Sequence, residues 1–595
     1  MDKIRNILKE IIERVFSVEV DVEVTLAPEL DEKGINDTFS PDFATNVAMK
    51  LAGELRKRSE KANPREIAET LKTEFLSGID GKHPEFLGTK VEVAGPGFLN
   101  FTPGDEFYSN FIGEFGEKFE NFNEKTSLDE YSGKTVICEF SDPNPFKVLH
   151  VGHLYTSIVG DSISRLIENA GGKVVRANFG GDVGLHVAKT IYAMQLNNLS
   201  NVDFTIEDIA RAYVEGTRAY EEDEEAKQRI VQLNKIIYEI SELGEGNCDN
   251  LKDDERAVAE IYWNGRKLSY RYFENFYKTI GVKFDKFYPE SSVAKIGLKK
   301  VLEQKEKGVY TESDGAVVFK GEDFGLHTRV FVNKAGLPTY EAKDVGLLFA
   351  KWADYEFDES VVITGNDITD YMKVVLKSIE QYAPELVAKT THITHGNVRL
   401  PGNEKMSSRK GNFVKAVDVL DMVRRALPGE KEDEISSDET IVLDSVALGA
   451  VKYFFLKYKI GGDIIFDVEE SVSLNGNSGP YLQYSAVRAK KILSKLGADD
   501  SNEVVSNFGM SVFERKLNKK FVQYPEVLRG ATREKAPHLV ASYLFELAQD
   551  FSRFYENCKV AGDEREAQRR KFVELFTKIM EHGLNILGID IPESM

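Results

Sequence analysis

The sequence predicts an α/β protein: a doubly wound parallel sheet in the middle of the chain, a small α+β domain before it and an all-α helical bundle after it. Three observations indicate this architecture. A strand–loop–helix–strand pattern begins near residue 130, apolar residues recur at helical spacing beyond about residue 470, and the first stretch mixes helical stripes with strand-like runs. We expect domains at 1–115, 116–470 and 471–595, with an acidic helical insertion at about 195–300.

The N-terminal region carries two helical patterns and a hairpin. Apolar residues recur every four positions from Phe43 to Leu55, which predicts a helical stripe. In NPREIAETLKTEFL, Asn63 is a typical N-cap, with Pro64 at the first helical position and Glu66 three residues after the cap. KVEVAGPGFLNFTP predicts two short strands around a Gly-Pro-Gly turn. No pattern here points to catalysis, so we expect a binding or structural domain.

The central region opens with the βαβ pattern of a Rossmann-type domain. KTVICEFS is a short strand-like run, DPNPFKVLHVGH is a loop with two prolines, and LYTSIVGDSISRLIENAGG is an amphipathic helix that ends at two glycines. KVVRANFGGDVG predicts the next strand and turn. Strand, loop, helix and strand in this order are typical of a parallel, doubly wound sheet.

The remainder of the chain is mostly helical. Residues 200 to about 280 are acidic, with 18 Asp and Glu against 10 Lys and Arg between 203 and 275, and we interpret them as solvated helices without chemistry. Strand-like runs return at GAVVFKG, HTRVFVNKAG and SVVITGND. Beyond about 470, long amphipathic segments predict a helical bundle, and no repeat of fixed period indicates a solenoid.

Length and composition fit an ordinary multidomain globular protein. The chain has 595 residues, 42% hydrophobic and 29% charged, which is enough apolar material for several cores. No stretch approaches the roughly 18 uninterrupted apolar residues of a membrane span, and MDKIRNILKEIIERVF lacks the apolar core of a signal peptide. Cys138, Cys248 and Cys558 stand far apart, without zinc or redox spacing. These features predict a cytoplasmic protein with no membrane association.

Charge is distributed unevenly along the chain. The net charge of −21 argues against a protein that coats nucleic acid by bulk attraction. Residues 476–595, however, hold 18 Lys and Arg against 16 Asp and Glu, so this region is slightly basic while the rest is acidic. A polyanionic partner would find a basic surface most readily at the C-terminal end, although an ordinary domain has the same composition.

The sharpest chemical signal is HVGH, from His150 to His153. It lies between a strand and the start of a helix, the point of a doubly wound fold that faces the ligand crevice, and a helix N-terminus favours negative charge. The two histidines could donate hydrogen bonds to phosphate oxygens, and Gly152 would let a flat ring approach the backbone. The alternatives are two surface histidines or a metal site. No HExxH pattern accompanies them, so we expect no metal held by the protein.

A second signal, EKMSSRKGN, follows about 250 residues later. Lys405, Arg409 and Lys410 flank two serines and precede Gly411, and cations, hydroxyls and a mobile backbone together can clamp a phosphate. An ordinary basic surface loop is the alternative. Neither a Walker GxxxxGK[ST] nor a GxGxxG motif occurs at a strand end, so a P-loop NTPase and a dinucleotide dehydrogenase are not supported.

Together, HVGH and KMSSR resemble the HIGH and KMSKS signatures of class I aminoacyl-tRNA synthetases. In that family both motifs bind ATP and stabilise the α-phosphate while the amino acid carboxylate displaces pyrophosphate. The resemblance implies catalytic roles for His150, His153, Lys405, Arg409 and Lys410. It implies ATP contacts, with Mg²⁺ bound to the ATP, from His150, Gly152, His153, Gly365, Asp367, Lys405, Met406, Ser407 and Ser408.

Within this class the sequence is similar to the arginyl-tRNA synthetases. CEFSDPNPFKVLHVGH resembles their signature, and the likeness extends from DFATNVAMKLA through NFGGDVG and LPTYEAKD to GPYLQYSAVRA and the terminal LNILGIDIPESM. A guanidinium is planar and permanently charged, so its pocket needs carboxylates for forked hydrogen bonds, for which Glu139 and Asp344 are the candidates. The expected arginine contacts are Glu139, Phe140, Ser141, Asn144, His150, Asp182, Tyr340, Asp344 and Ile368.

Two segments depart from the family pattern. Where the family usually has G-A-D-Q-x-x-H-F, this chain has GNDITDYM, so Ile368 replaces a glutamine that contacts arginine and Tyr371 replaces a histidine. Asp367 or Asp370 could compensate. Ser408 takes the place of the second lysine of KMSKS, for which a neighbouring cation could substitute.

The resemblance also implies tRNA(Arg) as a partner of a monomeric protein, gripped at its elbow by the N-terminal domain and read at its anticodon by the bundle. Aromatic rings, an amide and a cation in GPYLQYSAVRAKK suit an unpaired base and its phosphate, although the two tyrosines could instead belong to the core of the bundle. The expected tRNA contacts are Phe43, Asn46, Tyr481, Gln483, Tyr484, Arg488 and Met595.

The predicted activity is ATP-dependent conversion of L-arginine to arginyl-adenylate, followed by transfer to the 3′ end of tRNA with release of AMP. Two alternatives remain. A small-molecule nucleotidyltransferase with a HIGH motif would need neither flanking domain. A catalytically inactive, synthetase-like tRNA-binding protein would need neither His150 and His153 nor Lys405 intact.

Overall fold

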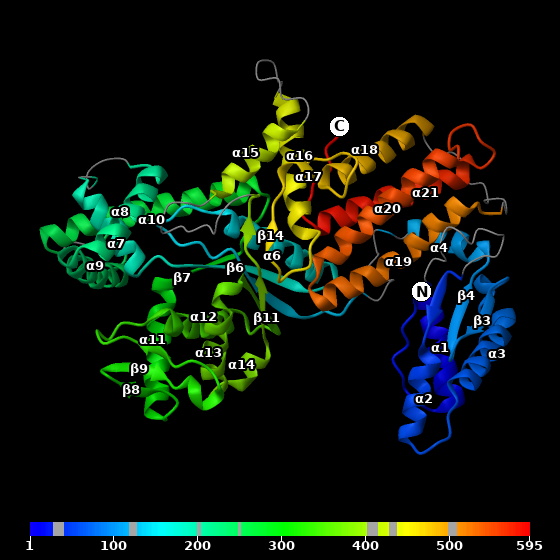
Figure 1. Cartoon of the computed structure of the whole chain (residues 1–595), viewed down its shortest axis with the longest axis horizontal. Coiled ribbons are helices and arrows are strands. Elements are labelled where there is room, and N and C mark those ends of the chain that lie inside the picture. The colour runs from blue at the N-terminus through cyan, green and yellow to red at the C-terminus, as the bar shows by residue number, and fades with distance from the viewer. Residues whose placement is uncertain are drawn as a thin grey trace.

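A computed structural model of the chain describes residues 1–27, 41–117, 119, 128–197, 199, 204–247, 251–401, 414–427, 437–497 and 509–595. The predicted combination is confirmed: an antiparallel sheet with helices near the N-terminus, a parallel sheet in the middle and helices at the C-terminal end (Figure 1). No helix in these ranges is long and apolar enough to cross a membrane.

The N-terminal part is a four-stranded antiparallel sheet in the order β1-β2-β4-β3, covered by helices. As predicted, Asn63 caps α3, because its Oδ1 accepts the backbone N–H of Arg65 at 3.0 Å, and the two strands around the Gly-Pro-Gly turn form. The elements are α1 (Asp2–Phe16), β1 (Thr25–Leu26), β2 (Phe43–Thr45), α2 (Val47–Lys57), α3 (Pro64–Lys82), η2 (Pro84–Phe86), β3 (Lys90–Ala94), β4 (Phe98–Thr102) and α4 (Asp105–Glu117).

One N-terminal prediction is wrong. Helix α2 begins at Val47, and Phe43 lies in strand β2, where it pairs with Phe101 of β4. The hydroxyl of Thr45 accepts the backbone N–H of Val47 at 3.2 Å, so the strand ends and the helix starts at this point. Strand pairing with a segment far along the chain decides the conformation, and a four-residue apolar period does not contain that information.

The central sheet has five parallel strands in the order β12-β11-β5-β6-β7, which confirms the doubly wound fold. The strands are β5 (Thr135–Glu139), β6 (Lys173–Gly180), β7 (Lys286–Pro289), β11 (Glu359–Gly365) and β12 (Thr390–His395). The strand order reverses between β5 and β11, and ligands of such folds bind beyond the carboxyl ends of the strands at this switch point.

Helix α6 (Val151–Asn169) connects β5 with β6 and ends before Gly171, whose φ of 85° favours glycine. The acidic region is helical, as predicted, but the range expected for the insertion also contains β7 of the central sheet, so the insertion ends earlier than predicted. Its helices are α7 (Leu185–Leu196), α8 (Ile206–Glu222), α9 (Glu224–Leu243) and α10 (Asp253–Thr279), at the left end of Figure 1.

The second half of the central region adds a small antiparallel sheet and helices that carry site residues. The elements are α11 (Glu290–Glu306), β8 (Thr311–Ser313), β9 (Ala316–Phe319), η5 (Gly321–Phe324), β10 (Arg329–Val332), α12 (Tyr340–Tyr355), η6 (Asn366–Ile368), α13 (Thr369–Glu380), α14 (Pro384–Ala388), β13 (Val398–Arg399), α15 (Ala416–Ala426), α16 (Ser437–Leu456), β14 (Ile464–Ile465) and α17 (Val468–Ser471).

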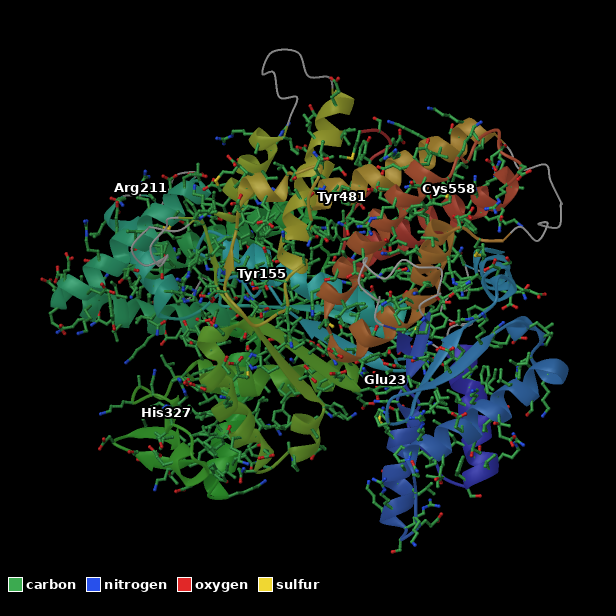
Figure 2. The ribbon with its side chains drawn as sticks, turned by 45° about the vertical axis from the view of Figure 1, so that its right-hand side comes forward. Glu23, Tyr155, Arg211, His327, Tyr481 and Cys558 are labelled. Atoms are coloured by element: carbon green, nitrogen blue, oxygen red, sulfur yellow. The ribbon has the colours of Figure 1, made fainter. Side chains whose placement is uncertain are left out.

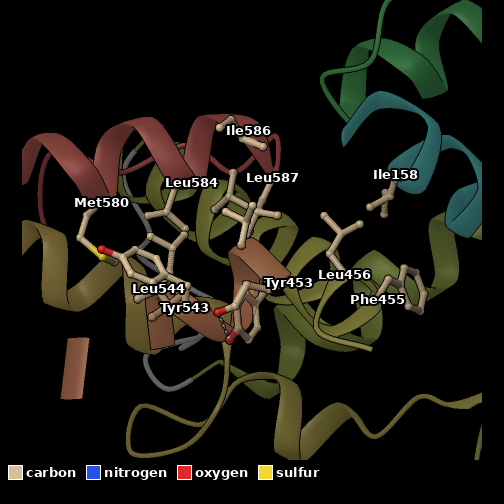
Figure 3. Close-up of a cluster of buried hydrophobic side chains, with 14 of the residues drawn as sticks. Ile158, Tyr453, Phe455, Leu456, Tyr543, Leu544, Met580, Leu584, Ile586 and Leu587 are labelled. Carbon is tan, nitrogen blue, oxygen red and sulfur yellow. Dashed lines mark hydrogen bonds between the residues drawn. The ribbon is translucent and has the colours of Figure 1, made fainter. Parts of the chain in front are cut away.

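The C-terminal bundle shares one hydrophobic core with helix α6 and α16. Figure 3 shows Ile158 of α6 near Leu456 of α16, with Leu587 and then Leu584 of the last segment farther to the left, and all four side chains are buried. The helices of the bundle are α18 (Gly479–Leu496), α19 (Val512–Glu534), α20 (Pro537–Asn557) and α21 (Glu566–Ile586).

The N-terminal part is docked on α19 through charged groups. Arg515 pairs with Asp42 and, at 3.1 Å, with Asp105, and Arg529 pairs with Asp2. Most of these side chains are wholly or partly buried, so the ion pairs fix the position of the N-terminal part on α19.

Candidate active site

The loop after β5 holds an unusual backbone conformation. Ser141, Asp142 and Phe146 have φ values of 75°, 46° and 65°, a region that residues other than glycine rarely occupy. The loop is fixed from outside, since Ser141 Oγ lies 2.9 Å from the hydroxyl of Tyr277 and the backbone N–H of Phe146 donates to Ser269 Oγ at 3.0 Å. Backbone strain of this kind persists only where the surroundings impose it, and it clusters at functional sites.

The HVGH motif forms the N-terminus of α6. His150 is the N-cap, and its Nδ1 accepts the backbone N–H of Gly152 at 3.1 Å, while Nδ1 of His153 accepts the backbone N–H of His150 at 3.2 Å. The ring centroids are 3.9 Å apart. A Cβ on Gly152 would stand 2.9 Å from the His150 ring, so the flat ring that approaches this glycine is that of His150 itself.

Both imidazoles are neutral near pH 7. Burial, and then the nearby Lys147, lower the pKa of His150 to about 4. Burial, and then His150, lower the pKa of His153 well below its usual value. Because each Nδ1 accepts a backbone hydrogen bond, we assign the ring proton to Nε2. The helix N-terminus therefore carries two N–H donors that are not used by the cap.

The segment that follows the second motif borders the first motif. Val414 accepts the backbone N–H of Val151 at 3.0 Å, and Lys415 forms a β-bridge with His150. The chain segment that directly follows the motif is thus fixed against HVGH, although about 250 residues separate the two in sequence. The motif residues themselves lie within 402–413, outside the described residues: Lys405, Met406, Ser407, Ser408, Arg409 and Lys410.

The two carboxylates predicted to bind a guanidinium line one small cavity of about 20 Å³. Glu139, at the end of β5, is 3% exposed, and its carboxylate pairs with Lys351 Nζ at 2.6 Å. Lys351 also donates to Ser360 Oγ at 2.9 Å. Asp344, on α12, accepts a hydrogen bond from the hydroxyl of Tyr371.

The carboxyl group of Asp344 is buried, and burial disfavours its charged form. Burial raises the pKa of Asp344 to about 8, the Tyr371 hydrogen bond opposes the shift, and Glu139 and Glu290 add to it. Near pH 7 this carboxyl is therefore mostly protonated, and a cation that enters the cavity favours the loss of that proton.

The other predicted arginine contacts do not line this cavity. Ser141 and Asn144 lie on the strained loop, and Asn144 Oδ1 approaches Gly181 so closely that a Cβ there would stand 2.1 Å away. Tyr340 is 51% exposed at the start of α12, one turn before Asp344. At the end of β11, Gly365 and Ile368 are half-buried and Asp367 is exposed to solvent.

Two predicted arginine contacts need correction. The ring of Phe140 is fully buried against Gly160 of α6, so only its backbone can reach a ligand. Asp182 is also fully buried, and its carboxylate accepts hydrogen bonds from Arg266 Nε at 2.9 Å and from the Ser291 hydroxyl at 2.7 Å. The Asp182 carboxylate therefore links α10 to α11, and a sequence pattern does not reveal this role.

Known protein families account for three parts of the chain. Residues 121–468 match the family described as tRNA synthetases class I (R), catalytic domain. The chain belongs to the arginyl-tRNA synthetase family. Residues 2–102 match the arginyl tRNA synthetase N terminal domain, and residues 482–595 match the DALR anticodon binding domain.

Relatives in this family span the whole chain. An arginine–tRNA ligase of Treponema denticola is 26% identical across 100% of this chain and 98% of its own length, and one of Fusobacterium nucleatum is 29% identical across 96% and 95%. The solved arginyl-tRNA synthetase of Thermus thermophilus superposes with a TM-score of 0.74 at 23% identity, covering 100% of both chains. That of Plasmodium falciparum has a TM-score of 0.73 at 21% identity, covering 100% and 99%. At these identities the structural likeness establishes the fold.

Sequence reasoning missed the buried cations of this synthetase site. Lys351 neutralises Glu139, and Lys343 pairs with Glu290, with all four side chains almost fully buried. A signal for Lys351 was available, because it follows Asp344 by seven residues, which is two helical turns and the same helix face.

Helix α18 presents two of the predicted tRNA contacts of the family on one face. Tyr484 is 41% exposed, and the Arg488 guanidinium lies 4.7 Å from the ring centroid of Tyr555. Tyr481, labelled in Figure 2, is half-buried and packs on Phe545 with ring centroids 5.7 Å apart. Tyr481 is therefore partly a bundle-core residue, whereas Tyr484 faces solvent.

Two other predicted tRNA contacts need correction. Gln483 is fully buried, and its Nε2 donates to the carbonyls of Ser445 and Asp590 at 3.2 and 2.7 Å, so its amide ties α18 to α16 and to the C-terminal segment. The Phe43 side chain is fully buried in the N-terminal core. Neither side chain can meet a tRNA. Asn46 and Met595 are half-exposed.

Proposed function

We propose that the chain is an arginine–tRNA ligase that activates L-arginine with ATP and esterifies tRNA(Arg). Relatives of that name align with the chain over nearly their whole length, and the three matched families cover the catalytic, N-terminal and anticodon-binding parts. The observation that carries the proposal is the contact between HVGH and Val414 and Lys415, because it joins the chain directly after the second phosphate-binding signal to the helix N-terminus that carries the first.

Activation requires stabilisation of negative charge on the α-phosphate. A carboxylate oxygen of arginine attacks the α-phosphorus, the bond to the bridging oxygen breaks, and pyrophosphate leaves with that electron pair. His150 and His153 donate through Nε2 to the phosphate oxygens as their charge grows, and the start of α6 adds its own positive potential. Because the two rings are fixed by the cap, little reorganisation accompanies the reaction.

The second motif completes the phosphate site in this proposal. Lys405, Arg409 and Lys410 add positive charge, and Met406, Ser407 and Ser408 border the nucleotide. Gly152 brings the backbone of α6 close, and Gly365 and Asp367 at the end of β11 contact the ATP from the opposite side. Mg²⁺ would enter bound to ATP, where it offsets phosphate charge, since such ions seldom need a protein cage.

Arginine fits between the strained loop and α12. Ser141, Asn144 and the backbone of Phe140 hold its α-amino and carboxylate end beside His150, while the guanidinium extends toward Glu139 and Asp344. Tyr340 covers the entrance and Ile368 lines it without a hydrogen bond. Transfer then requires the terminal tRNA hydroxyl to attack the arginyl carbonyl, with AMP as the leaving group.

The tRNA contacts lie at the two ends of the chain, with Asn46 near the elbow and Tyr484, Arg488, Met595 and the edge of Tyr481 near the anticodon. Exposed rings stack on unpaired bases and cations meet phosphates. We further propose that the protein acts as a monomer in the cytoplasm.

ATP–pyrophosphate exchange, run with and without tRNA, and aminoacylation of purified tRNA test this function. We expect arginine-dependent exchange and charging of tRNA(Arg). Exchange without charging would indicate a small-molecule nucleotidyltransferase. Binding of tRNA with neither reaction would indicate an inactive, synthetase-like protein.

A further inference from the structure

The acidic side chains that act on Asp344 differ in how their charges are balanced. Glu139 pairs with Lys351 at 2.6 Å, and Glu290 pairs with Lys343. Glu341, on the same helix as Asp344, pairs with Arg329 at 3.2 Å. Each of these three acidic groups therefore has its own cation. The cations come from α12 and from β10.

Asp344 is held differently. Within the described part of the chain no cation forms an ion pair with its carboxylate, and its hydrogen-bond donor is the neutral hydroxyl of Tyr371. Asp142, the remaining acidic neighbour, accepts the backbone N–H of Phe179 at 2.8 Å, and burial, and then Glu139, raise its pKa well above the usual range. Of these two carboxylates without an ion pair, Asp344 lines the cavity, so its charge is the one that a bound cation would balance.

Tyr371 is fixed from two sides. Its hydroxyl meets Asp344 of α12, and its ring lies under the guanidinium of Arg329, 5.2 Å from the centroid. Arg329 is in turn anchored by Glu341. The phenol therefore lies between β10 and α12, and its direction is set by the fold and not by the ligand.

We propose that Tyr371 is a specificity-determining residue of the arginine pocket: its hydroxyl aims the Asp344 carboxylate at the guanidinium and leaves the negative charge of Asp344 for the substrate. A cationic side chain at position 371 would neutralise the Asp344 carboxylate, and an apolar side chain would leave the orientation of that carboxylate unfixed. The inference rests on the proposed function, since it takes arginine as the substrate.

The role has a signature in the pH dependence of binding. Asp344 has a pKa raised to about 8, chiefly by burial, and the Tyr371 hydrogen bond is the first influence that lowers it. A cationic ligand requires the ionised carboxylate, so arginine affinity should increase as the pH rises toward that value. Loss of the hydroxyl raises the pKa of Asp344 further, which moves the increase in affinity to higher pH.

The test is calorimetric titration of the full-length protein with arginine between pH 6 and 9, comparing the natural chain with Tyr371→Phe. A displacement of one pH unit would weaken binding at pH 7 about tenfold, and the deficit should shrink toward pH 9. The KM for ATP should change less than twofold. Selectivity for arginine over citrulline, its neutral analogue, should fall by a similar factor, because a protonated carboxyl loses its preference for a cation.

Tyr382→Phe is the matched control, since Tyr382 lies in the same hydrophobic cluster and its hydroxyl meets that of Tyr310 at 3.3 Å. It should bind arginine like the natural chain at every pH. Asp344→Asn is a second test that keeps the shape and removes the titrating group. It should bind arginine weakly and with no pH dependence from this group.

The outcomes separate the two proposals. A natural chain that binds no arginine at any pH overturns the proposed function and this inference with it. A natural chain that binds arginine, with Tyr371→Phe showing the same pH profile and selectivity, overturns this inference alone. So does an equal loss of arginine and ATP binding, because that result indicates a structural role for Tyr371.

Discussion

Removing the charge of Glu139 should have two effects that can be separated experimentally. In Glu139→Gln the amide keeps the shape of the carboxylate but leaves Lys351 buried, 2% exposed, without its ion-pair partner. Breaking one side of a buried pair destabilises a protein by about 3–5 kcal/mol. The same change removes a charged acceptor from the guanidinium, worth about 1.5–3 kcal/mol, which is roughly a 10- to 150-fold loss of arginine affinity.

The double variant Glu139→Gln/Lys351→Met divides these effects. Replacing both members of a buried pair by neutral groups of similar volume is often nearly neutral for stability, so most of the lost free energy of unfolding should return. Arginine affinity should stay low, since the acceptor is still missing. Lys373→Met is the control for a lysine at an exposed pair, where we expect a change of about 1 kcal/mol or less.

Urea denaturation and calorimetric titration with arginine and ATP measure both quantities. The reasoning is refuted if Glu139→Gln is as stable as the natural chain, or if the double variant is no more stable than the single one. Recovery of arginine affinity in the double variant would refute the role of Glu139 in binding.

Three further predictions concern catalysis, tRNA and pH. His153→Ala should lower the exchange rate about 10²–10³-fold with little change in the KM for ATP, and near-normal turnover would exclude its transition-state role. Arg488→Ala should raise the KM for tRNA and flatten its salt dependence without changing the melting temperature or ATP binding; an unchanged KM would place the RNA elsewhere. His582 has a pKa lowered by burial from 6.5 to about 4. The unfolded chain therefore takes up its proton first, and stability should fall as the pH drops from about 6.5 to 4, by about 3 kcal/mol for this residue. His582→Asn should reduce this slope in acid denaturation, and an unchanged slope would contradict the assignment.

Local patterns were sufficient for the parts of the fold that depend on neighbouring residues. The capped helix after Asn63, the βαβ unit and the histidines at the start of α6 are each specified within about twenty residues, by caps, glycines and apolar periodicity. The candidate carboxylates Glu139 and Asp344 could be selected in the same way, because each lies at the end or start of a recognisable element.

The remaining features depend on contacts between distant parts of the chain. Phe43 joins a strand because Phe101 pairs with it, and Gln483 is buried because Asp590 accepts its amide. The pairing of Glu139 with Lys351 joins residues 212 positions apart. Caps and periodicity carry no information on such partners. A binding role predicted from sequence can therefore fall on a side chain whose polar groups are already bonded to another part of the fold.

Helix α6 connects the proposed chemistry with the C-terminal bundle. Its first turn carries His150 and His153, and its body contributes Ile158 and Ser162 to the interface with the bundle, where Ser162 Oγ donates to the carbonyl of Ile586 at 3.0 Å. The same hydrophobic cluster continues through α16 and α21, so the helix cannot move without disturbing packing on both sides. Histidines that stabilise a transition state must hold their direction before the reaction begins. The shared core thus gives the helix N-terminus a rigid support that the central sheet, which contacts only one face of α6, does not provide alone.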